Sequence, residues 1–452
     1  MWKLLKLISR MLVWFGVFWP IVFVYSRVIR EVESEHRKKN LPAILALSHT
    51  RFRKDIEVLA NTGEFRVLIV PEVWQSRIIT LFYPRGITKA QIFFPEKYVE
   101  VVEAKRRLYD FLRNFLPHLY RILGIKCVIG ASLFYSNDYE WGKISDEIGV
   151  PYVLIPRENH ALETSDHIRY KDNNYYEVGN IRFPGSMIMC QNQSFRDLYI
   201  DFGFVTPQKI VAFGCLRMDE FIRNVKSYKK NVSKRRKVVF FSFNLGANLI
   251  GHPDHVAYFD NVAWTSKPDV GWAKLFESTH SAYAKLAMKR PDVDFIFKPK
   301  WLGGWKDKIE EAISNQGIDI QRITNLNFTE EDAGNLILDS DVVCCFGSNT
   351  IIEAGFARKP VIIPMYYEAT RRDYAEYIHF HNYYHIFDIA ESEEAFVNLI
   401  EEKLSNPIVD KELVKEREAF FKYNFQSTKP DAAIKCTNVI KDVISRNYAL
   451  TS

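Results

Sequence analysis

The stretch FGSNTIIEAGFARKPVIIP, residues 346–364, decides the fold. It begins at the end of an apolar run, DVVCCF at 341–346, and it finishes in a second apolar run after Lys359. Gly-Ser-Asn-Thr and a segment with helical spacing lie between the two runs. This succession predicts a β-α-β unit with parallel strands that are buried on both faces.

The junction between the first strand and the helix suits phosphate binding. Gly347, Ser348 and Asn349 are small enough for a ligand to approach the backbone N–H groups where the helix begins, at Thr350. That end of a helix carries partial positive charge and unpaired donors. Glu353, one turn further on, can accept hydrogen bonds from two ribose hydroxyls. Thr350 and Glu353 also form the T-x-x-E pattern of an ordinary capping box, so both interpretations stay open.

The rest of the chain alternates between apolar runs and amphipathic segments. In the first half, helical spacing covers 97–123 and 194–201, and the strand candidates are 43–49, 66–71, 126–131, 152–156, 187–190 and 210–213. In the second half, helices are expected at 272–289, 393–404 and 431–445, and strands at 237–243, 293–300, 341–346 and 360–365. The basic segment NVKSYKKNVSKRRK, 224–237, indicates a linker. We therefore expect two α/β domains with a ligand crevice at the carboxyl ends of their strands.

Length and composition agree with two folded domains. The chain has 452 residues, of which 47% are hydrophobic and 26% charged, so it is too apolar for a disordered protein. Its formal charge of +6 permits anionic lipid or phosphate ligands but gives no argument for nucleic acid as a partner. The six cysteines show no metal spacing and are expected to be reduced thiols, two of them in a strand.

The N-terminus is expected to associate with a membrane. Fifteen uncharged residues, 11–25, are flanked by five Lys or Arg residues with no acid before Glu31. This run is shorter than the ~20 residues that span a bilayer, and Pro20 is expected to kink it. Trp2, Trp14 and Trp19 suit a helix that lies in the lipid interface. A spanning helix and a helix packed on the protein itself are the alternatives.

Three further segments are expected at the same strand ends. Lys298 and Lys300 follow a predicted strand and can offset diphosphate charge. Asn244, Gly246 and Asn248 form a small-residue loop after the first strand of the second half, and FGCLRMDEF places Gly214, Arg217 and Asp219 where the two domains are expected to meet.

Together these segments resemble the GT-B glycosyltransferase superfamily, within it the surface-carbohydrate group. That group includes capsule and lipopolysaccharide glycosyltransferases and CDP-glycerol-type polyol-phosphate transferases, and UDP-N-acetylglucosamine 2-epimerases share the fold. GSNTIIEAGFARKPVIIP resembles the G-S-x-x-x-x-E-A…KPVI..P donor signature, and FGCLRMDEF resembles a G-x-x-R-x-D element. The resemblance runs from Leu41 to the C-terminus.

The resemblance implies two Rossmann-like domains that face each other across a cleft. The expected division is a membrane-associated helix at 1–40, an acceptor domain at 41–223, a linker at 224–236, a nucleotide-sugar domain at 237–430 and a C-terminal helix at 431–452 that can cross back to the first domain.

The resemblance also assigns residues. Ser348, Asn349 and Thr350 would contact the donor diphosphate and Glu353 the ribose, with no obligatory metal or other cofactor. Relatives often carry K/R-x-H-P after the second strand of this domain, whereas here the residues are Lys298-Pro299-Lys300-Trp301. A relative's catalytic histidine therefore has no counterpart at this place.

The group that deprotonates an acceptor hydroxyl is expected in the first half. Glu158 and His160, in the loop LIPRENHALET after a predicted strand, are the first candidates. His49 and Asp55 are the second, and for each of these residues a hydrogen-bonded loop side chain is the plainer alternative.

Two other features remain weak as sites. The loop at 251–272 is rich in aromatic, Asp and His residues and can close over a ligand or simply pack on the surface, and His252 and His255 lack a third metal ligand. The DSD at 339–341 precedes a strand and is a poor metal site.

The sequence thus favours a membrane-associated GT-B glycosyltransferase. It would use a nucleotide-sugar donor and a lipid-linked or growing surface-polysaccharide acceptor at the cytoplasmic face of the plasma membrane. A CDP-polyol phosphotransferase, a sugar-nucleotide epimerase and a non-catalytic glycan-binding membrane protein are the alternatives.

Overall fold

The computed structural model describes residues 17–36, 40–52, 54–84, 86–87, 89–93, 95–156, 181–228, 235–247, 249, 255–257, 264–266, 271–300 and 302–451. These residues form two compact units. Unit 1 contains the described residues up to 156, residues 181–220 and those from Phe425 onward, and unit 2 contains those of Phe221–Asn424. The chain thus leaves unit 1 within one helix and returns to it at the end of another.

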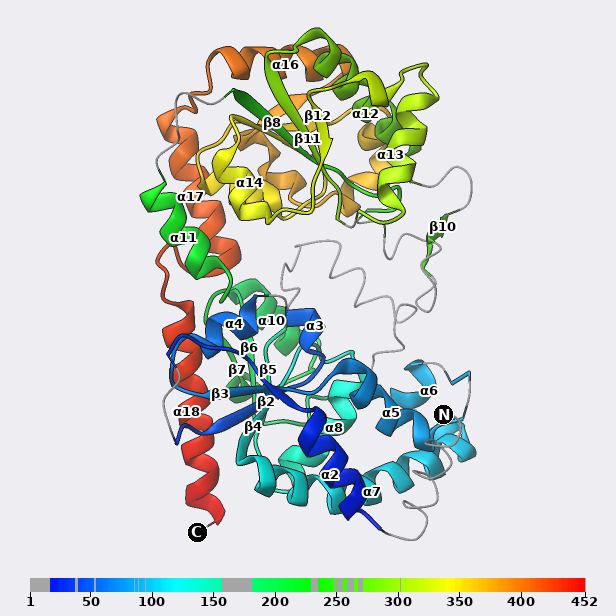
Figure 1. Ribbon diagram of the computed structural model, residues 1–452, viewed down its shortest axis with the longest axis vertical. Helices are drawn as coiled ribbons and strands as arrows, with labels where there is room; N and C mark the ends of the chain where they lie inside the picture. The colour runs from blue at the N-terminus through cyan, green and yellow to red at the C-terminus, as the bar shows by residue number, and fades with distance from the viewer. Residues whose placement is uncertain are drawn as a thin grey trace. The chain divides into compact units, whose positions relative to one another are not determined.

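Unit 1 is built on a seven-stranded sheet in the order β1-β3-β2-β4-β5-β6-β7 (Figure 1). The edge strand β1 is antiparallel to β3, and every other pair is parallel. The strands are β1 (Arg30–Glu31), β2 (Ala43–Ala46), β3 (Arg66–Ile69), β4 (Ile125–Gly130), β5 (Tyr152–Leu154), β6 (Met187–Cys190) and β7 (Ile210–Ala212). All four residues of β2 are buried, as expected for a parallel strand that is covered on both faces.

Helices cover both faces of this sheet. One layer holds α2, α5, α7 and α8, and the other holds α4 and α18. The helices of unit 1 are α2 (Trp19–Val28), α3 (His49–Phe52), α4 (Asp55–Ala60), α5 (Glu72–Phe82), α6 (Lys89–Phe93), α7 (Val99–Leu123), α8 (Ser136–Glu147), α10 (Gln193–Asp201) and α18 (Ala432–Thr451), with α11 (Met218–Ser227) leading out of the unit. In α7, Leu108, Leu112, Phe115 and Leu119 recur at helical spacing and are fully buried.

Helix α18 belongs to the core of unit 1 although it comes last in the sequence. Cys436, Ile440, Val443 and Ile444 are buried in one cluster with residues of β2 and β4. Figure 1 shows this helix, in red, running along the unit.

Unit 2 is built on a six-stranded parallel sheet in the order β12-β11-β8-β13-β14-β15. Its strands are β8 (Arg236–Phe241), β11 (Val293–Lys298), β12 (Leu326–Phe328), β13 (Val342–Cys345), β14 (Val361–Pro364) and β15 (Asp388–Ala390), and β9 (His255–Ala257) and β10 (Trp264–Ser266) form a separate antiparallel pair. If the six strands are numbered by their order along the chain, they lie in the sheet in the order 3-2-1-4-5-6, which is typical of a dinucleotide-binding Rossmann domain.

Helices also cover both faces of the second sheet. Helices α12, α13 and α16 pack together on one face, and α14 and α15 pack on the other (Figure 1). The helices of unit 2 are α12 (Ala273–Lys289), α13 (Trp305–Ser314), α14 (Ala333–Asp339), α15 (Thr350–Phe356), α16 (Glu393–Ser405) and α17 (Lys411–Phe425). The two predicted α/β Rossmann-like sheets are therefore confirmed.

The segment expected to be a linker begins as a helix. Helix α11 extends to Ser227, and β8 starts at Arg236, so the residues at 224–227 are helical. Helix α11 has an apolar face at helical spacing, formed by Met218, Phe221, Ile222 and Val225. The expected linker began at residue 224, so it contained only Val225 of this face and the helical pattern was missed.

The described part of the N-terminus packs on unit 1. Ile21, Val22 and Tyr25 of α2 are buried, and the Tyr25 ring contacts Phe115 of α7 edge-on at 5.3 Å. Pro20 lies in the first helical turn, where its missing N–H costs nothing, so the predicted kink is wrong for α2. Among the described helices, none is long and apolar enough to cross a membrane.

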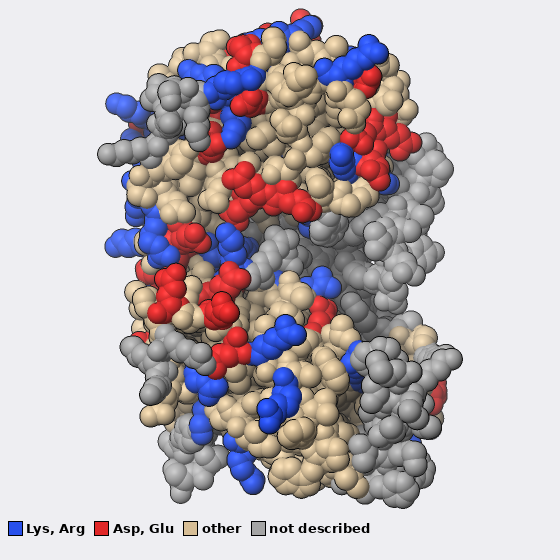
Figure 2. Space-filling model, in the orientation of Figure 1, with Lys and Arg blue, Asp and Glu red and all other residues tan. Residues whose placement is uncertain are grey.

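Charges are mixed on the described surface. Figure 2 shows Lys and Arg side chains interspersed with Asp and Glu side chains over the face in view, which gives that face no strong field of one sign. All six cysteines are free and buried, as predicted.

Candidate functional site

The three loops predicted to bind the donor follow three neighbouring strands of unit 2. In the sheet, β8 lies between β11 and β13, and Phe241 at the end of β8 pairs with both Lys298 and Cys345. The sheet order reverses between β8 and β13, and open α/β sheets bind ligands at the carboxyl ends of the strands at such a switch point. The residues after these strands therefore form one candidate site.

The loop after β8 is held by its own hydrogen bonds and by Trp272. The Asn244 side chain accepts from the backbone N–H of Gly246 at 3.0 Å. Trp272 is fully buried, and its indole N–H donates to the Ala247 carbonyl at 2.7 Å. The Trp272 ring packs edge-on against Phe346, the last residue before the β13 loop, at 5.0 Å. Trp272 thus fixes the two loops at the switch point against each other.

Beneath the β8 loop lies a buried neutral histidine. His280 of α12 is fully buried, and its Nε2 lies 2.8 Å from the hydroxyl of Ser242, just beyond β8. Its Nδ1 lies 2.6 Å from the Phe276 carbonyl, which can only accept, so Nδ1 carries the proton and Nε2 accepts from Ser242. Burial lowers the pKa of His280 to about 3.

The loop after β13 has the sharp turn that close ligand approach requires. Gly347 has φ +56°, in the left-handed region that favours glycine. The hydroxyl of Ser348 accepts from the hydroxyl of Thr350 at 2.8 Å and from its backbone N–H at 3.3 Å. Asn349 and Glu353 are the other predicted donor-binding residues of this segment, and Glu353 is half-buried in α15.

The capping-box alternative is wrong. The residue at the N-cap of α15 is Asn349, and its side chain makes no capping hydrogen bond, while Thr350 is already the first helical residue. Because α15 spans only seven residues, its dipole contributes little to anion binding, and the hydroxyls and cations of the loops contribute more.

The two lysines lie at the end of the neighbouring strand. Lys298 is half-buried, and its ammonium donates to the Pro299 carbonyl at 3.3 Å, whereas Lys300 is exposed. Both follow β11 directly, so their charges lie on the same edge of the sheet as the two loops.

Arg217 and Asp219 form contacts within unit 1. Arg217 donates to the buried carboxylate of Asp55 from its backbone at 2.9 Å and from its guanidinium at 3.1 Å. The buried Asp219 carboxylate accepts from the backbone N–H groups of Ala432 and Ala433, at the start of α18. The G-x-x-R-x-D element therefore holds two helices of unit 1 just before the chain enters unit 2.

A buried polar network at the carboxyl edge of the first sheet was not predicted from the sequence. Asp138 accepts from the Ser48 hydroxyl at 2.6 Å, from the Gln75 amide at 2.9 Å and from the Ala131 backbone at 2.8 Å. Gln75 in turn accepts from the Ser48 backbone N–H at 2.8 Å. Burial raises the pKa of Asp138 to about 6. Ser48, Gln75 and Asp138 are separated in sequence, so no local motif could have revealed this network, which we call the Ser48 network.

Several predicted residues lie outside the described part of the chain. These are Glu158, His160 and the rest of their loop, together with Asn248, His252 and most of the 251–272 segment. Their roles stay predictions. Within the described residues, no group of three or more His, Cys, Asp or Glu side chains is arranged to hold a metal ion.

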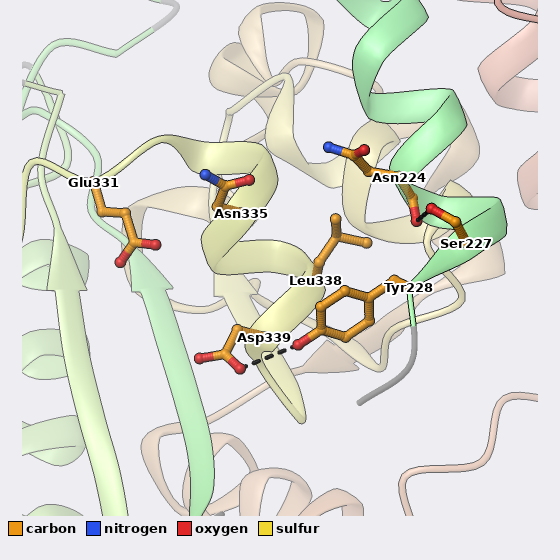
Figure 3. A pocket seen from close by; sticks show the side chains of 7 residues that line it. All are labelled: Asn224, Ser227, Tyr228, Glu331, Asn335, Leu338 and Asp339. Atoms are coloured by element: carbon orange, nitrogen blue, oxygen red, sulfur yellow. Dashed lines mark hydrogen bonds between the residues drawn. The ribbon is translucent and has the colours of Figure 1, made fainter. Parts of the chain in front are cut away.

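A pocket of about 550 Å³ lies elsewhere in unit 2 (Figure 3). Its lining comes from α11, α14 and their flanking residues: Asn224, Ser227, Tyr228, Glu331, Asn335, Leu338 and Asp339. Tyr228 precedes β8 and Asp339 precedes β13, and their side chains share a hydrogen bond of 3.1 Å. The pocket therefore runs along α14, from Glu331 just after β12 to Asp339 just before β13, and its lining includes none of the candidate donor residues.

Comparison with solved structures gives the fold a name. A structure from Listeria monocytogenes, described as a candidate UDP-N-acetylglucosamine 2-epimerase, superimposes with a TM-score of 0.50 over 90% of this chain and 97% of that chain, at 13% identity. The chain has the GT-B fold. Other GT-B structures match less well: UDP-GlcNAc 2-epimerase from Neisseria meningitidis bound to UDP-GlcNAc has a TM-score of 0.47 at 10% identity, covering 90% and 99% of the two chains. The wall teichoic acid polymerase TagF has a TM-score of 0.46 at 12% identity, covering 92% of each.

Sequence comparison adds nothing to the GT-B assignment, since no family model and no curated protein matches the chain. In GT-B terms, unit 1 is the N-terminal Rossmann-like domain and unit 2 the C-terminal one.

Proposed function

We propose that the protein is a metal-independent glycosyltransferase. It would move a sugar from a nucleotide-sugar donor to a lipid-linked or growing surface polysaccharide at the cytoplasmic face of the plasma membrane. One observation carries the proposal: three loops with small, hydroxyl-bearing and cationic residues meet at the switch point of a Rossmann sheet.

Each loop has a defined task in this proposal. Ser348, Asn349 and Thr350 bind the diphosphate by hydrogen bonds, and Glu353 accepts from the ribose hydroxyls. Lys298 and Lys300 balance the charge of the leaving nucleoside diphosphate, which removes the need for a metal. Asn244 and Gly246 close the site from the other side of the switch point.

The described N-terminal helix supports action at a membrane. Trp19 and Phe23 of α2 are 60% and 59% exposed, although the Trp19 ring also lies 4.7 Å from that of His118 on α7, and Arg27 and Arg30 are nearby in sequence. Aromatic and cationic side chains together favour the interface of an anionic bilayer.

The first experiment is a thermal-shift screen of the full chain against UDP-, GDP-, dTDP-, CDP- and CMP-sugars, with and without EDTA. A donor at 100-fold its dissociation constant should stabilise the protein by about 2.7 kcal/mol. Stabilisation by one nucleotide class that survives EDTA supports the metal-free site. Stabilisation that EDTA abolishes contradicts metal independence, and no shift with any nucleotide contradicts the donor site.

Variants of the loop then locate the donor. Ser348→Ala and Glu353→Ala should each weaken donor binding about tenfold or more, because each removes a hydrogen bond to a charged or buried ligand group. Ser314→Ala and Glu311→Ala, two exposed positions on α13, are matched controls that should bind as the wild type does. Wild-type affinity in both loop variants would refute the assignment.

A sugar-nucleotide 2-epimerase is the second candidate. The observation that favours it is the Listeria monocytogenes match, which is described as such an enzyme. Incubation with UDP-N-acetylglucosamine alone, followed by NMR of the product, separates the two: an epimerase converts the nucleotide sugar without an acceptor. Polyol-phosphate transfer would appear instead as selective stabilisation by CDP donors.

A further inference from the structure

The pocket of unit 2 has two walls, each formed by one face of a helical segment. Residues three and four positions apart lie on the same face of a helix. This spacing occurs in α11 and its end, and again in α14 and the residues that lead into it. The lining residues of the first wall are Asn224, Ser227 and Tyr228, and those of the second are Glu331, Asn335, Leu338 and Asp339 (Figure 3).

The two walls are held together at both ends. At one end, a Cβ atom at Gly334 would lie 3.0 Å from the Phe221 ring, so the glycine allows α11 to approach α14 closely. At the other end, the Tyr228 hydroxyl donates to the Asp339 carboxylate at 3.1 Å, and Lys237 pairs with the same carboxylate. The pocket between these contacts therefore has a shape that is fixed before a ligand binds.

The lining can donate and accept hydrogen bonds at several points. Among the described lining residues, all except Leu338 are polar. Each of the Asn224 and Asn335 amides offers both a donor and an acceptor, and the Glu331 carboxylate offers acceptors. Figure 3 shows the two amides on one side of Leu338 and the Tyr228–Asp339 pair on the other. A ligand with several neighbouring hydroxyls, such as a sugar, can use both sides at once.

Tyr228 and Leu338 provide apolar contact area among these polar groups. The Tyr228 side chain is 39% exposed, and its ring is fixed by the bond to Asp339 and by the Lys359 ammonium, 5.9 Å from the ring centroid. Leu338 is 5% exposed and lies deeper. The C–H groups of a sugar ring can pack on an aromatic ring while its hydroxyls form hydrogen bonds. The pocket thus combines the two kinds of contact that a sugar offers.

The charges around the pocket disfavour phosphates and nucleotides. Among the described residues that line it, none is a lysine or an arginine, and two are carboxylates. Of the nearby cations, Lys237 pairs with Asp339, and Lys359 donates to the carbonyls of Leu338 at 2.7 Å and Ser340 at 2.8 Å. An anionic ligand would face Glu331 without a cation committed to it, and like charges at close range repel.

We propose that the pocket between α11 and α14 is a carbohydrate-binding site that holds a short run of uncharged sugar residues of a glycan chain. Its volume of about 550 Å³ lies within the range of small-molecule sites, roughly 300–1,000 Å³. The site has no residue in common with the donor loops, so it binds the glycan itself and can be tested whether or not the protein transfers a sugar. A protein that holds its glycan in this way keeps the local concentration of that glycan high.

The experiment titrates the full chain with cellotriose, maltotriose and triacetylchitotriose in the presence of EDTA, by saturation-transfer NMR and calorimetry. At least one of these neutral oligosaccharides should bind. Asn335→Ala and Glu331→Gln should each weaken this binding about fivefold or more, because each removes or weakens hydrogen bonds to hydroxyls. Both positions are exposed, so the fold should be unaffected. Asn315→Ala and Glu311→Gln, at exposed positions after and on α13, are matched controls and should bind as the wild type does.

Two further comparisons test the assigned chemistry. Tyr228→Ala should weaken binding about tenfold, whereas Tyr228→Phe, which keeps the ring, should lose less. A hyaluronan tetrasaccharide, which carries carboxylates, should bind more weakly than triacetylchitotriose at low salt. Glu331→Gln should reduce this difference, because it removes one of the repelling charges.

Each contrary outcome overturns the proposal. One is the absence of binding by all three neutral oligosaccharides at about 10 mM, a concentration that largely fills even a site with a Kd of about 1 mM. Another is binding that stays at the wild-type level in Asn335→Ala and Glu331→Gln, since the glycan would then occupy a different site. Loss of nucleotide-sugar binding in these two variants would place a nucleotide in the pocket instead. A wild type that binds a neutral oligosaccharide but no nucleotide sugar would contradict the donor site and leave the glycan site intact.

Discussion

The carboxylate of Asp219 accepts a hydrogen bond from the backbone N–H of Ala432, at 3.0 Å, across 213 positions of the sequence. Its second oxygen accepts from the N–H of Ala433 at 2.8 Å. These are two of the N–H groups that the first turn of α18 cannot satisfy within the helix. Asp219 therefore fixes the start of the helix that completes the core of unit 1.

Asp219→Ala should destabilise unit 1 by about 2–3 kcal/mol, because it removes a cap and leaves two N–H groups without an acceptor in a buried place. The change is measured by the hydrogen exchange of α18 peptides at increasing urea concentrations. Asp332→Ala removes a comparable but exposed cap from α14, where Asp332 accepts from Gly334 and Asn335, and should cost about 1 kcal/mol. Equal losses in the two variants would contradict the buried role of Asp219.

His280 should make the stability of unit 2 depend on pH. Its folded pKa, about 3, lies below its ordinary value of 6.5, so the unfolded chain binds the proton first as the pH falls. Stability is then fully present above pH 6.5 and is lost progressively down to about pH 3, by about 2 kcal/mol between pH 7.5 and pH 5.

The measurement compares urea unfolding of unit 2 at both pH values for the wild type and His280→Gln. The variant should be less stable at pH 7.5 and should lose about 2 kcal/mol less on acidification. His381→Gln, at an exposed histidine, should keep the wild-type pH dependence. An unchanged pH dependence in His280→Gln would show that another group dominates.

Gly347→Ala should affect both the fold and the donor site. A side chain at φ +56° costs about 1 kcal/mol, and relief of that strain would move the Ser348 and Thr350 hydroxyls. We expect about 1 kcal/mol lower stability and donor binding weakened by tenfold or more in a thermal-shift titration. Gly317→Ala, also at positive φ (+74°) but after α13, should cost similar stability and leave donor binding unchanged.

Trp19→Ser combined with Phe23→Ser should weaken membrane binding. Partial burial of the two rings in lipid is worth about 1–3 kcal/mol, so the double variant should bind anionic vesicles about tenfold less tightly in a sedimentation assay. Val99→Ser on α7, where the valine is 82% exposed, is the matched control. Equal sedimentation of all three proteins would contradict the assignment of α2 to the lipid interface.

The sheets and the donor loops could be predicted because their signals are local. The apolar runs DVVCCF and KVVFFSF are long enough to indicate buried parallel strands, and the residues after Phe346 follow directly in the sequence. The alternation of strands and helices predicts a parallel sheet, and parallel strands have their carboxyl ends at one edge. The loops that follow these strands could therefore be predicted to lie close together.

The parts of the structure that could not be predicted from the sequence depend on contacts between residues far apart in the chain. Nothing near Ser48 predicts a left-handed conformation, because Gln75 and Asp138 impose it from two other elements. Likewise, Thr350 and Glu353 match a capping pattern, but the chain begins α15 one residue earlier and the hydroxyl bonds Ser348 instead. Local preference was overruled by tertiary contacts in both places.

The return of α18 to unit 1 imposes an order on synthesis. All six strands of the unit 2 sheet lie within Phe221–Asn424, so its core can close as soon as that segment has emerged. Unit 1 needs Cys436, Ile440 and Ile444 beside β2 and β4, although β4 ends 306 residues and β2 ends 390 residues before Cys436. We therefore expect the second half of the molecule to mature before the first during translation. The apolar residues of β2 and β4 that pack on α18 should stay partly uncovered, and accessible to chaperones, until α18 has emerged.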